Sequence, residues 1–224
     1  MSKGIFITAT GTDAGKTFVT ALLVKKLRQA GYNAGYYKAA LSGALRKAGQ
    51  LIPGDAQYVK QTAGIDTPLE QMVSYIYETA VSPHLAGELE GNPVELETVL
   101  RDYKAACGLH DYLTVEGSGG ILCPIRRDMY MLEDLIKAMG LDVLIVAPAG
   151  LGTINDTILT IEYARQRCIG VKGVILNWFH PGDMMEEDNR GFLEAYTGVP
   201  VIACVQEGDT DVDVDPAVLA ELYQ

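Results

Sequence analysis

Short apolar runs alternate with longer amphipathic stretches along almost the whole chain. The apolar runs have the length of buried strands, and the amphipathic stretches have the apolar spacing of helices. Strands are predicted at 5–7, 32–38, 73–77, 111–115, 143–147, 171–177 and 199–205. Helices are predicted at 18–31, 55–60, 93–106, 131–139, 153–167 and 184–196, with a short one from 216. Apolar strands separated by helices indicate the α/β class, with a mostly parallel sheet covered by helices on both faces.

The loop between the first predicted strand and the first predicted helix reads ATGTDAGKT, at residues 9–17. A loop that leads into a helix N-terminus presents unpaired backbone N–H groups and the positive end of the helix dipole, so it can hold an oligophosphate. Gly15 lets the backbone close against the phosphates, Lys16 reaches the β- and γ-phosphates, and the Thr17 hydroxyl can bind Mg²⁺. Thr10 stands where the usual phosphate loop (P-loop) has its first glycine. The motif predicts nucleoside triphosphate binding; the alternative is a tight turn with a surface lysine.

Charged and amide side chains recur where predicted strands end. Lys38 ends the second predicted strand and is followed by a predicted polar loop at 42–54, Glu116 follows the run 111–115, and Asn177 ends a later strand. Because ligands bind outside the carboxyl ends of strands in open α/β sheets, we expect these groups beside the phosphate loop. There Lys38 would stabilise the negative charge on a transferring γ-phosphoryl group. Taken alone, it could also be a solvated lysine at a strand end.

Two acidic residues are candidates for holding Mg²⁺. Glu116 follows an apolar run, and Asp55 opens a predicted helix. Magnesium prefers one or two carboxylates together with phosphate oxygens and water, so Thr17, Asp55 and Glu116 form a sufficient set. The alternatives are that Glu116 caps the glycine turn at 117–120 and that Asp55 is only a helix N-cap.

Composition narrows the possible functions. With 224 residues and 48% hydrophobic content, the chain can bury one substantial core, so we expect a single domain spanning 1–224. A net charge of −11 argues against a nucleic-acid partner. No apolar run approaches the roughly 18 residues of a membrane span, and no signal-peptide pattern follows Met1, so we expect no membrane partner and a cytoplasmic location. Four widely spaced cysteines are expected to be buried, reduced thiols: Cys107, Cys123, Cys168 and Cys204.

An ordered set of segments resembles the ATP-dependent dethiobiotin synthetases, and the resemblance covers nearly the whole chain. The segments are TDAGKT at 12–17, Lys38 with Ser42-Gly43, Gly54-Asp55-Ala56, Ser82-Pro83-His84, VEGSGG at 115–120, LGTIN at 151–155, and Asn177. Members of that family are cyclo-ligases of biotin biosynthesis with a P-loop NTPase fold. They carboxylate 7,8-diaminopelargonate with CO₂, use ATP and Mg²⁺, and close the ureido ring of dethiobiotin.

The resemblance implies a role for each matching residue. Lys38 would be the catalytic lysine, assisted by Lys16, and Mg²⁺ would be held by Thr17, Asp55 and Glu116. The ATP site would comprise Asp13, Ala14, Gly15, Lys16, Thr17 and Phe18 at the phosphates, Asp55, Glu116, Gly117, Ser118 and Gly119 beside them, and Leu176, Asn177, Val205, Gln206 and Glu207 around the adenine. Substrate would contact Thr12, Ser42, Ser82, Pro83, His84, Gly152, Thr153 and Asn155.

The family resemblance also implies a homodimer, in which the turn at 152–155 receives the substrate's distal carboxylate across the dimer interface. A helix N-terminus is suited to that role. Two positions depart from the family pattern: Ala9 replaces a frequent glycine, and Ala39 replaces the usual proline after Lys38. They are expected to stiffen the loop entry and to leave Lys38 less constrained.

The residue types present favour positioning and electrostatics over covalent catalysis. The histidines, His84, His110 and His180, are distant in sequence from any obvious Ser or Cys nucleophile. We therefore expect a substrate carbamate to attack the γ-phosphorus, with Lys16, Lys38 and Mg²⁺ stabilising the charge. The second amine would then capture the carbamic-phosphoric anhydride and release phosphate.

A competing hypothesis is a regulatory P-loop ATPase of the partitioning or septum-site type, which shares this fold. Such switches usually carry a second lysine early in the phosphate loop, a basic patch or a membrane-binding C-terminal helix. Residues 9–11 contain no lysine, and the region 207–215 is acidic. A third possibility, an amidotransferase-linked ligase, would need an ammonia source, and no glutaminase domain is recognisable.

Three residues near these motifs could either contact a ligand or have a structural role. His84 could donate to substrate or belong to the start of a helix after Ser82-Pro83. Trp178 and Phe179 follow Asn177, and we expect packing rather than adenine stacking from both.

Overall fold

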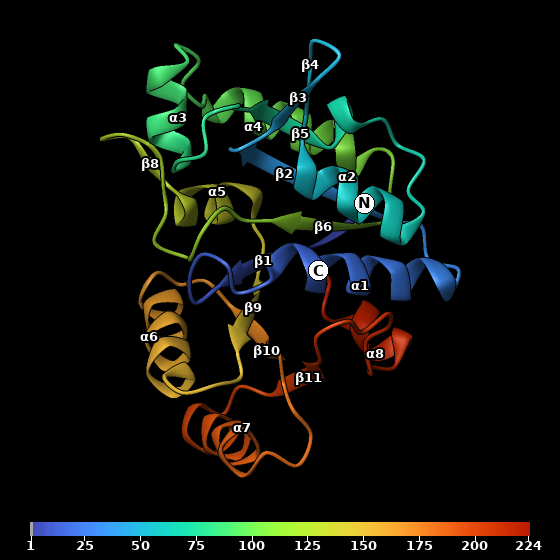
Figure 1. Ribbon diagram of the computed structural model, residues 1–224, viewed down its shortest axis with the longest axis vertical. Helices are drawn as coiled ribbons and strands as arrows, with labels where there is room; N and C mark the ends of the chain where they lie inside the picture. Colours follow the sequence, from blue (N-terminus) through green and yellow to red (C-terminus); the bar gives the residue numbers. More distant parts are fainter. Residues whose placement is uncertain (1) are drawn as a thin grey trace.

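The computed structural model describes residues 2–224. Its centre is a seven-stranded sheet in which every strand pairs parallel to its neighbours, in the order β11-β10-β9-β1-β6-β2-β5 (Figure 1). The strands are β1 (Lys3–Ala9), β2 (Ala34–Leu41), β5 (Val73–Ile76), β6 (Tyr112–Glu116), β9 (Val143–Pro148), β10 (Val171–Asn177) and β11 (Val201–Val205). The predicted parallel α/β architecture is confirmed.

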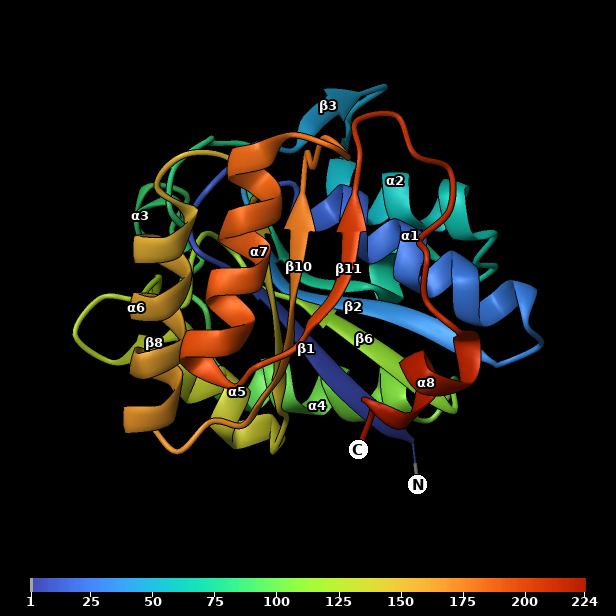
Figure 2. The same cartoon turned by 90° about the horizontal axis from the view of Figure 1, so that it is seen from below.

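Helices cover both faces of the sheet (Figure 2). One face carries α1 (Lys16–Gln29), α2 (Gly54–Ala63) and α8 (Pro216–Glu221); the other carries α4 (Leu96–Cys107), α5 (Leu132–Met139), α6 (Thr153–Gln166) and α7 (Met184–Thr197). A short helix α3 (Pro83–Leu89) and a 3-10 turn η1 (Leu69–Gln71) complete the helical elements. Ile5 and Ile7 of β1 pack into one core cluster and Phe6 into the other. The run Ile5-Phe6-Ile7 is therefore apolar at consecutive positions, because alternate side chains enter two separate cores.

Two small antiparallel hairpins were not predicted. β3 (Leu45–Lys47) pairs with β4 (Gln50–Ile52), inside a stretch expected to be a polar loop, and β7 (Pro124–Arg126) pairs with β8 (Tyr130–Met131). The loop prediction for 42–54 was therefore wrong in part.

The expected end of the second strand at Lys38 was also wrong. β2 continues to Leu41, because Lys38, Ala40 and Leu41 each pair with β5. Lys38 consequently lies inside a paired strand, where its backbone is fixed by neighbours on both sides.

All four cysteines are free thiols, but they differ in burial. Cys123 is buried, Cys107 and Cys204 are half-buried, and Cys168 is exposed. Cys168 lies in the turn that follows α6, so the prediction that all four are buried was wrong. Within residues 2–224 no helix is long and apolar enough to cross a membrane.

Candidate active site

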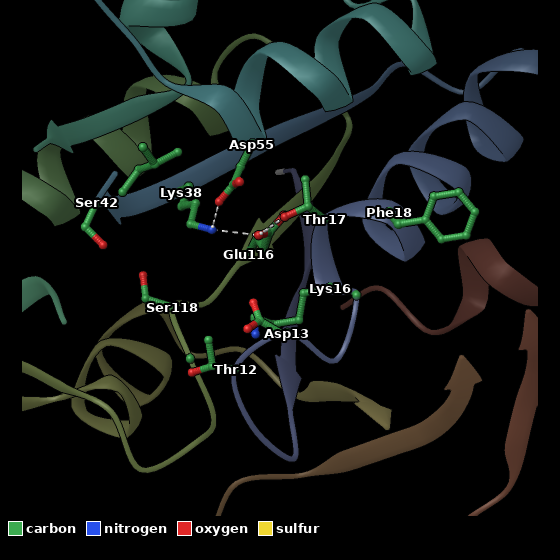
Figure 3. A pocket seen from close by; sticks show the side chains of 13 residues that line it. Thr12, Asp13, Lys16, Thr17, Phe18, Lys38, Ser42, Asp55, Glu116 and Ser118 are labelled. Atoms are coloured by element: carbon green, nitrogen blue, oxygen red, sulfur yellow. Dashed lines mark hydrogen bonds and ion pairs between the residues drawn. The ribbon is translucent and has the colours of Figure 1, made fainter. Parts of the chain in front are cut away.

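A cavity of about 320 Å³ opens at the carboxyl ends of β1, β2 and β6 (Figure 3). Its walls combine the phosphate loop, the end of β2, the start of α2 and the turn after β6. The lining residues are Thr12, Asp13, Gly15, Lys16, Thr17, Phe18, Lys38, Leu41, Ser42, Asp55, Glu116, Ser118 and Gly119. Residues from four separate sequence motifs therefore share one pocket.

The phosphate loop passes directly from β1 into α1. Gly15 is the N-cap residue of α1 with φ 85°, a left-handed conformation that suits glycine. No side chain caps α1 and its first turn contains no acid, so the N–H groups there are open to an anion. The Lys16 side chain is buried, and its Nζ donates to the Gly11 carbonyl at 3.2 Å. The alternative of a turn with a surface lysine is therefore wrong.

Lys38 joins two carboxylates above this loop. Its Nζ lies 2.5 Å from Asp55 Oδ2 and 2.6 Å from Glu116 Oε1 (Figure 3). Burial lowers the pKa of Lys38, but the attraction of Glu116 and Asp55 outweighs it and raises the pKa to about 12. Lys38 is 5% exposed, so it is not the solvated strand-end lysine of the alternative hypothesis, and it stays a cation at neutral pH.

The second lysine is in a different electrostatic position. Burial lowers the pKa of Lys16; Glu116 raises it, and the nearby Lys38 lowers it further. Among residues 2–224, Lys16 has one hydrogen-bond partner, a neutral carbonyl, whereas Lys38 has two carboxylates. Lys16 is therefore the cation that an incoming anion can engage without displacing a carboxylate.

Glu116 is 1% exposed and is held by three side chains. Its Oε1 accepts from Thr17 Oγ1 at 2.8 Å and from Lys38, and its Oε2 accepts from Tyr36 Oη at 3.2 Å. It does not cap the glycine turn. Asp55 lies in the first turn of α2 behind the N-cap Pro53, so the N-cap alternative is also wrong.

Sequence reasoning missed Tyr36, which donates a hydrogen bond to Glu116. Tyr36 precedes Lys38 by two residues on β2, so both side chains lie on the same face of the strand. That alternation was the available signal. Burial and the neighbouring Glu116 raise the pKa of Tyr36, which keeps its hydroxyl protonated as a donor to Glu116.

The oxygen donors of this cluster fit a magnesium ion. Thr17 and Lys38 both contact Glu116 Oε1, and Lys38 bridges to Asp55, so a hydroxyl and two carboxylates surround one cationic position. No group of three or more His, Cys, Asp or Glu side chains suited to a metal occurs among residues 2–224. One hydroxyl and two carboxylates leave room in a coordination shell for phosphate oxygens and water, which Mg²⁺ usually retains.

Comparison with known proteins identifies the family. Residues 3–212 match a family described as AAA domain. The chain is 48% identical over 226 residues to ATP-dependent dethiobiotin synthetase BioD of Clostridium botulinum (strain 657 / Type Ba4), covering 100% of this chain and 99% of that protein. It is 49% identical to the protein of the same name from Brachyspira hyodysenteriae, covering 95% and 96%. The chain belongs to the dethiobiotin synthetase family.

Some solved structures with a similar fold carry other names. The MinC:MinD cell division protein complex of Aquifex aeolicus matches with a TM-score of 0.53 and 15% identity, over 92% of this chain and 82% of that one. At that identity the similarity shows a shared fold alone. This similarity therefore does not support the hypothesis of a septum-site ATPase, because the synthetases have the same architecture.

The residues that the family pattern assigns to adenine form a separate group. Asn177 ends β10 opposite Val205 of β11, next to Leu176, and none of them lines the cavity. Asn177 Nδ2 donates to the Ala14 carbonyl at 3.0 Å, which ties this group to the phosphate loop. Gln206 and Glu207 follow β11 and are exposed.

Core packing does not account for the Trp178 side chain. Phe179 is 4% exposed and belongs to a core cluster, as predicted for a packing residue. Trp178 is 37% exposed and belongs to neither cluster of the described residues. The prediction that both aromatic residues pack was therefore wrong for Trp178.

Only some of the substrate residues expected for a synthetase reach the pocket. Thr12 and Ser42 line it. Ser82, Pro83 and His84, and also Gly152, Thr153 and Asn155, lie outside its lining within the described chain. His84 Nδ1 lies 3.0 Å from Ser82 Oγ at the start of α3.

Gly117 and Ala14 support the pocket from behind. A Cβ at Gly117 would lie 2.8 Å from Phe6 and 2.9 Å from Leu132, so only glycine fits this point after β6. Ala14 is a buried residue of the phosphate loop. Both residues were predicted to contact nucleotide, and neither is among the residues that line the cavity.

Proposed function

We propose that this enzyme, a ligase that forms C–N bonds, converts 7,8-diaminopelargonate, CO₂ and ATP to dethiobiotin, ADP and phosphate, with residues 1–224 acting as one ligase domain. Membership of the synthetase family supports the reaction. The observation that carries the assignment of residues is Lys38 between Asp55 and Glu116, in one pocket with Lys16 and the phosphate loop.

We propose that the reaction proceeds through two intermediates, a carbamate and then a carbamic-phosphoric anhydride. One substrate amine loses a proton and bonds to CO₂, giving a carbamate. A carbamate oxygen attacks the γ-phosphorus and ADP leaves, giving a carbamic-phosphoric anhydride. The second amine attacks the carbamoyl carbon, loses its proton and expels phosphate, which closes the ureido ring.

The two lysines stabilise the charge that moves through these steps. Lys16 binds the β- and γ-phosphate oxygens at the N-terminus of α1, and Lys38 faces the transferring group. With a pKa of about 12, Lys38 holds its proton and acts as a fixed cation, not as the base that deprotonates the amine. Thr17, Asp55 and Glu116 would hold Mg²⁺, which supplies further positive charge at the phosphates when bound.

Substrate and adenine occupy opposite sides of the phosphate loop in this proposal. Thr12, Ser42 and the segment 82–84 contact the diamine, while Leu176, Asn177 and the segment 205–207 cradle the adenine. The resemblance to the family implies a homodimer, in which we propose that residues 152–155, at the N-terminus of α6, bind the substrate carboxylate of a partner subunit.

Turnover of ATP with bicarbonate, measured with and without diaminopelargonate, tests the proposal. We expect phosphate release to depend on the diamine and dethiobiotin to accumulate in equal amount. A basal rate that ignores the diamine would favour a nucleotide-dependent switch instead.

A further inference from the structure

Glu116 ends β6 as a buried carboxylate whose two oxygens have different partners. Oε1 accepts from Thr17 Oγ1 at 2.8 Å and from Lys38 Nζ at 2.6 Å, and both donors belong to residues that line the cavity. Oε2 accepts from Tyr36 Oη at 3.2 Å, and Tyr36 is not among the lining residues. One oxygen of Glu116 therefore meets the reactive side of the pocket, and the other is bound from within the core.

Tyr36 is held in place by the core around it. It is 1% exposed and belongs to the core cluster that α1 shares with the sheet. In the register of β2 and β6, Tyr36 lies beside Thr114, two residues before the pair of Lys38 and Glu116. Within residues 2–224, Glu116 is the one hydrogen-bond partner of the Tyr36 hydroxyl. A phenylalanine ring could pack in the same place, so packing alone does not explain the hydroxyl.

The Tyr36 hydroxyl determines which way the carboxylate of Glu116 can turn. Without it, Oε2 would be a buried, charged acceptor that lacks a donor, which is costly. Rotation of the carboxylate would reduce that cost by letting Oε2 compete with Oε1 for Thr17 and Lys38. Carboxylates that hold a metal depend on outer hydrogen-bond partners for their orientation in the same way.

We propose that Tyr36 is a positioning residue, which binds Oε2 of Glu116 and thereby keeps Oε1 directed at Thr17 and Lys38, where Mg²⁺ would be held. The inference rests on the proposed function, because it assumes that a magnesium nucleotide binds at the phosphate loop. Tyr36 contacts neither nucleotide nor substrate in this assignment and acts through Glu116. Loss of its hydroxyl should therefore weaken binding of the metal and leave the phosphate loop intact.

Tyr37, the next residue of β2, provides a matched control. It is 0% exposed, and it belongs to the core cluster on the opposite face of the sheet. Its hydroxyl donates to the Val99 carbonyl at 3.0 Å and lies 2.6 Å from Ser74 Oγ. Tyr37→Phe therefore removes one buried, hydrogen-bonded hydroxyl next to Lys38 in the chain without removing a contact of Glu116.

The test separates binding of the metal from binding of the nucleotide. ADP is titrated by calorimetry into wild type, Tyr36→Phe and Tyr37→Phe, once with excess Mg²⁺ and once with EDTA. The ratio of the two ADP affinities gives the contribution of the metal. For each protein, kcat and KM for the diamine are measured as well, and the melting temperature reports any general loss of stability.

For Tyr36→Phe we expect the affinity ratio to fall roughly 10-fold, the lower end of the range for loss of an outer partner of a metal ligand. ADP affinity in EDTA should match the wild type, because Tyr36 does not line the cavity. The value of kcat should fall by a similar factor, with KM for the diamine unchanged. Tyr37→Phe should keep the wild-type affinity ratio, even if its melting temperature falls as far as that of Tyr36→Phe.

An unchanged affinity ratio in Tyr36→Phe, an equal fall in Tyr37→Phe, or a wild type whose ADP affinity does not depend on Mg²⁺ would overturn the inference. Weaker ADP binding by one factor with and without Mg²⁺ would also overturn it, because Tyr36 would then support the pocket as a whole. Diamine-dependent turnover of the wild type leaves the proposed ligase intact in each of these cases. A wild type that binds no ADP and forms no dethiobiotin would overturn both.

Discussion

Lys38 carries the positive charge between two carboxylates, and its replacement by alanine tests the catalytic role proposed for it. We expect Lys38→Ala to lower turnover by about 10²–10³, the range for losing one preorganised charge-stabilising group. ATP affinity should change only a few-fold, because Lys16 and the N-terminus of α1 remain. Single-turnover kinetics and calorimetry measure the two effects, with Lys137→Ala on the exposed face of α5 as the control. Unchanged turnover would remove Lys38 from the catalytic residues.

Gly15 offers a second test at the scale of one residue. Gly15 and Gly31 have nearly the same φ, 85° and 89°, but a Cβ at Gly15 would lie 2.0 Å from Asn177, whereas nothing lies within 4 Å of one at Gly31. Alanine at either position carries the same backbone strain, and only Gly15→Ala adds overpacking, which costs about 1–3 kcal/mol. Urea unfolding should show Gly15→Ala as the less stable variant by that difference. Equal stabilities would mean that the contact relaxes freely.

The charged residues and Thr17 of the pocket could be predicted because motif spacing and strand ends indicated that they lie together. Lys16, Thr17, Lys38, Asp55 and Glu116 all line the cavity. Sequence could not show that Lys38 binds both acids at once, since that depends on how α2 packs above β2. The hydrogen bond from Asn177 to the Ala14 carbonyl of the phosphate loop also depends on tertiary packing.

At the scale of elements, the segment before α7 contains a pH-dependent contact. His180 Nδ1 lies 3.0 Å from Glu186 Oε1, and Asp183 caps α7. The hydrogen bond and charge of Glu186 raise the pKa of His180. Stability from this pair is therefore complete below the unfolded pKa of about 6.5 and is lost as pH rises through the higher folded value.

The melting temperature of wild type minus that of His180→Gln, followed from pH 5.5 to 8.5, checks this sign. We expect the difference to be largest at the acidic end and to shrink as pH rises. Introducing Glu186→Gln into both proteins should remove most of this pH dependence, because Glu186 is the largest cause of the raised pKa of His180. A difference that grows with pH would contradict the assignment.

Element prediction succeeded where burial imposed a pattern and failed where it did not. β10 and α5 fall within a residue of their predicted limits, because their apolar residues face the core. The β3–β4 hairpin was missed because its residues are largely exposed, and its turn uses Ala48 and Gly49 at positive φ in place of a recognisable Asn-Gly pair. Burial, not intrinsic propensity, decided which elements could be found.

At the scale of the whole molecule, the placement of residues 152–155 outside the pocket makes a prediction about assembly. Suppose that residues 152–155 complete the active site of the partner subunit. A Lys38→Ala chain then still supplies an intact Asn155 to its partner, and an Asn155→Ala chain still has an intact pocket with Lys38. Mixing the two inactive variants after unfolding and refolding should restore about a quarter of wild-type activity, because random pairing leaves one intact site in half of the dimers. Either variant refolded alone should stay inactive, and no recovery on mixing would place the whole site within one chain.

The strand order has a consequence for biosynthesis. β1 carries the phosphate loop and lies between β6 and β9, yet β6 begins only at Tyr112 and β9 at Val143. While a ribosome makes the first half of the chain, this apolar strand has neither of its hydrogen-bonded neighbours. Non-local pairing of this kind is slow and exposes the nascent chain to aggregation, so chaperone dependence should centre on the interval before β6 emerges.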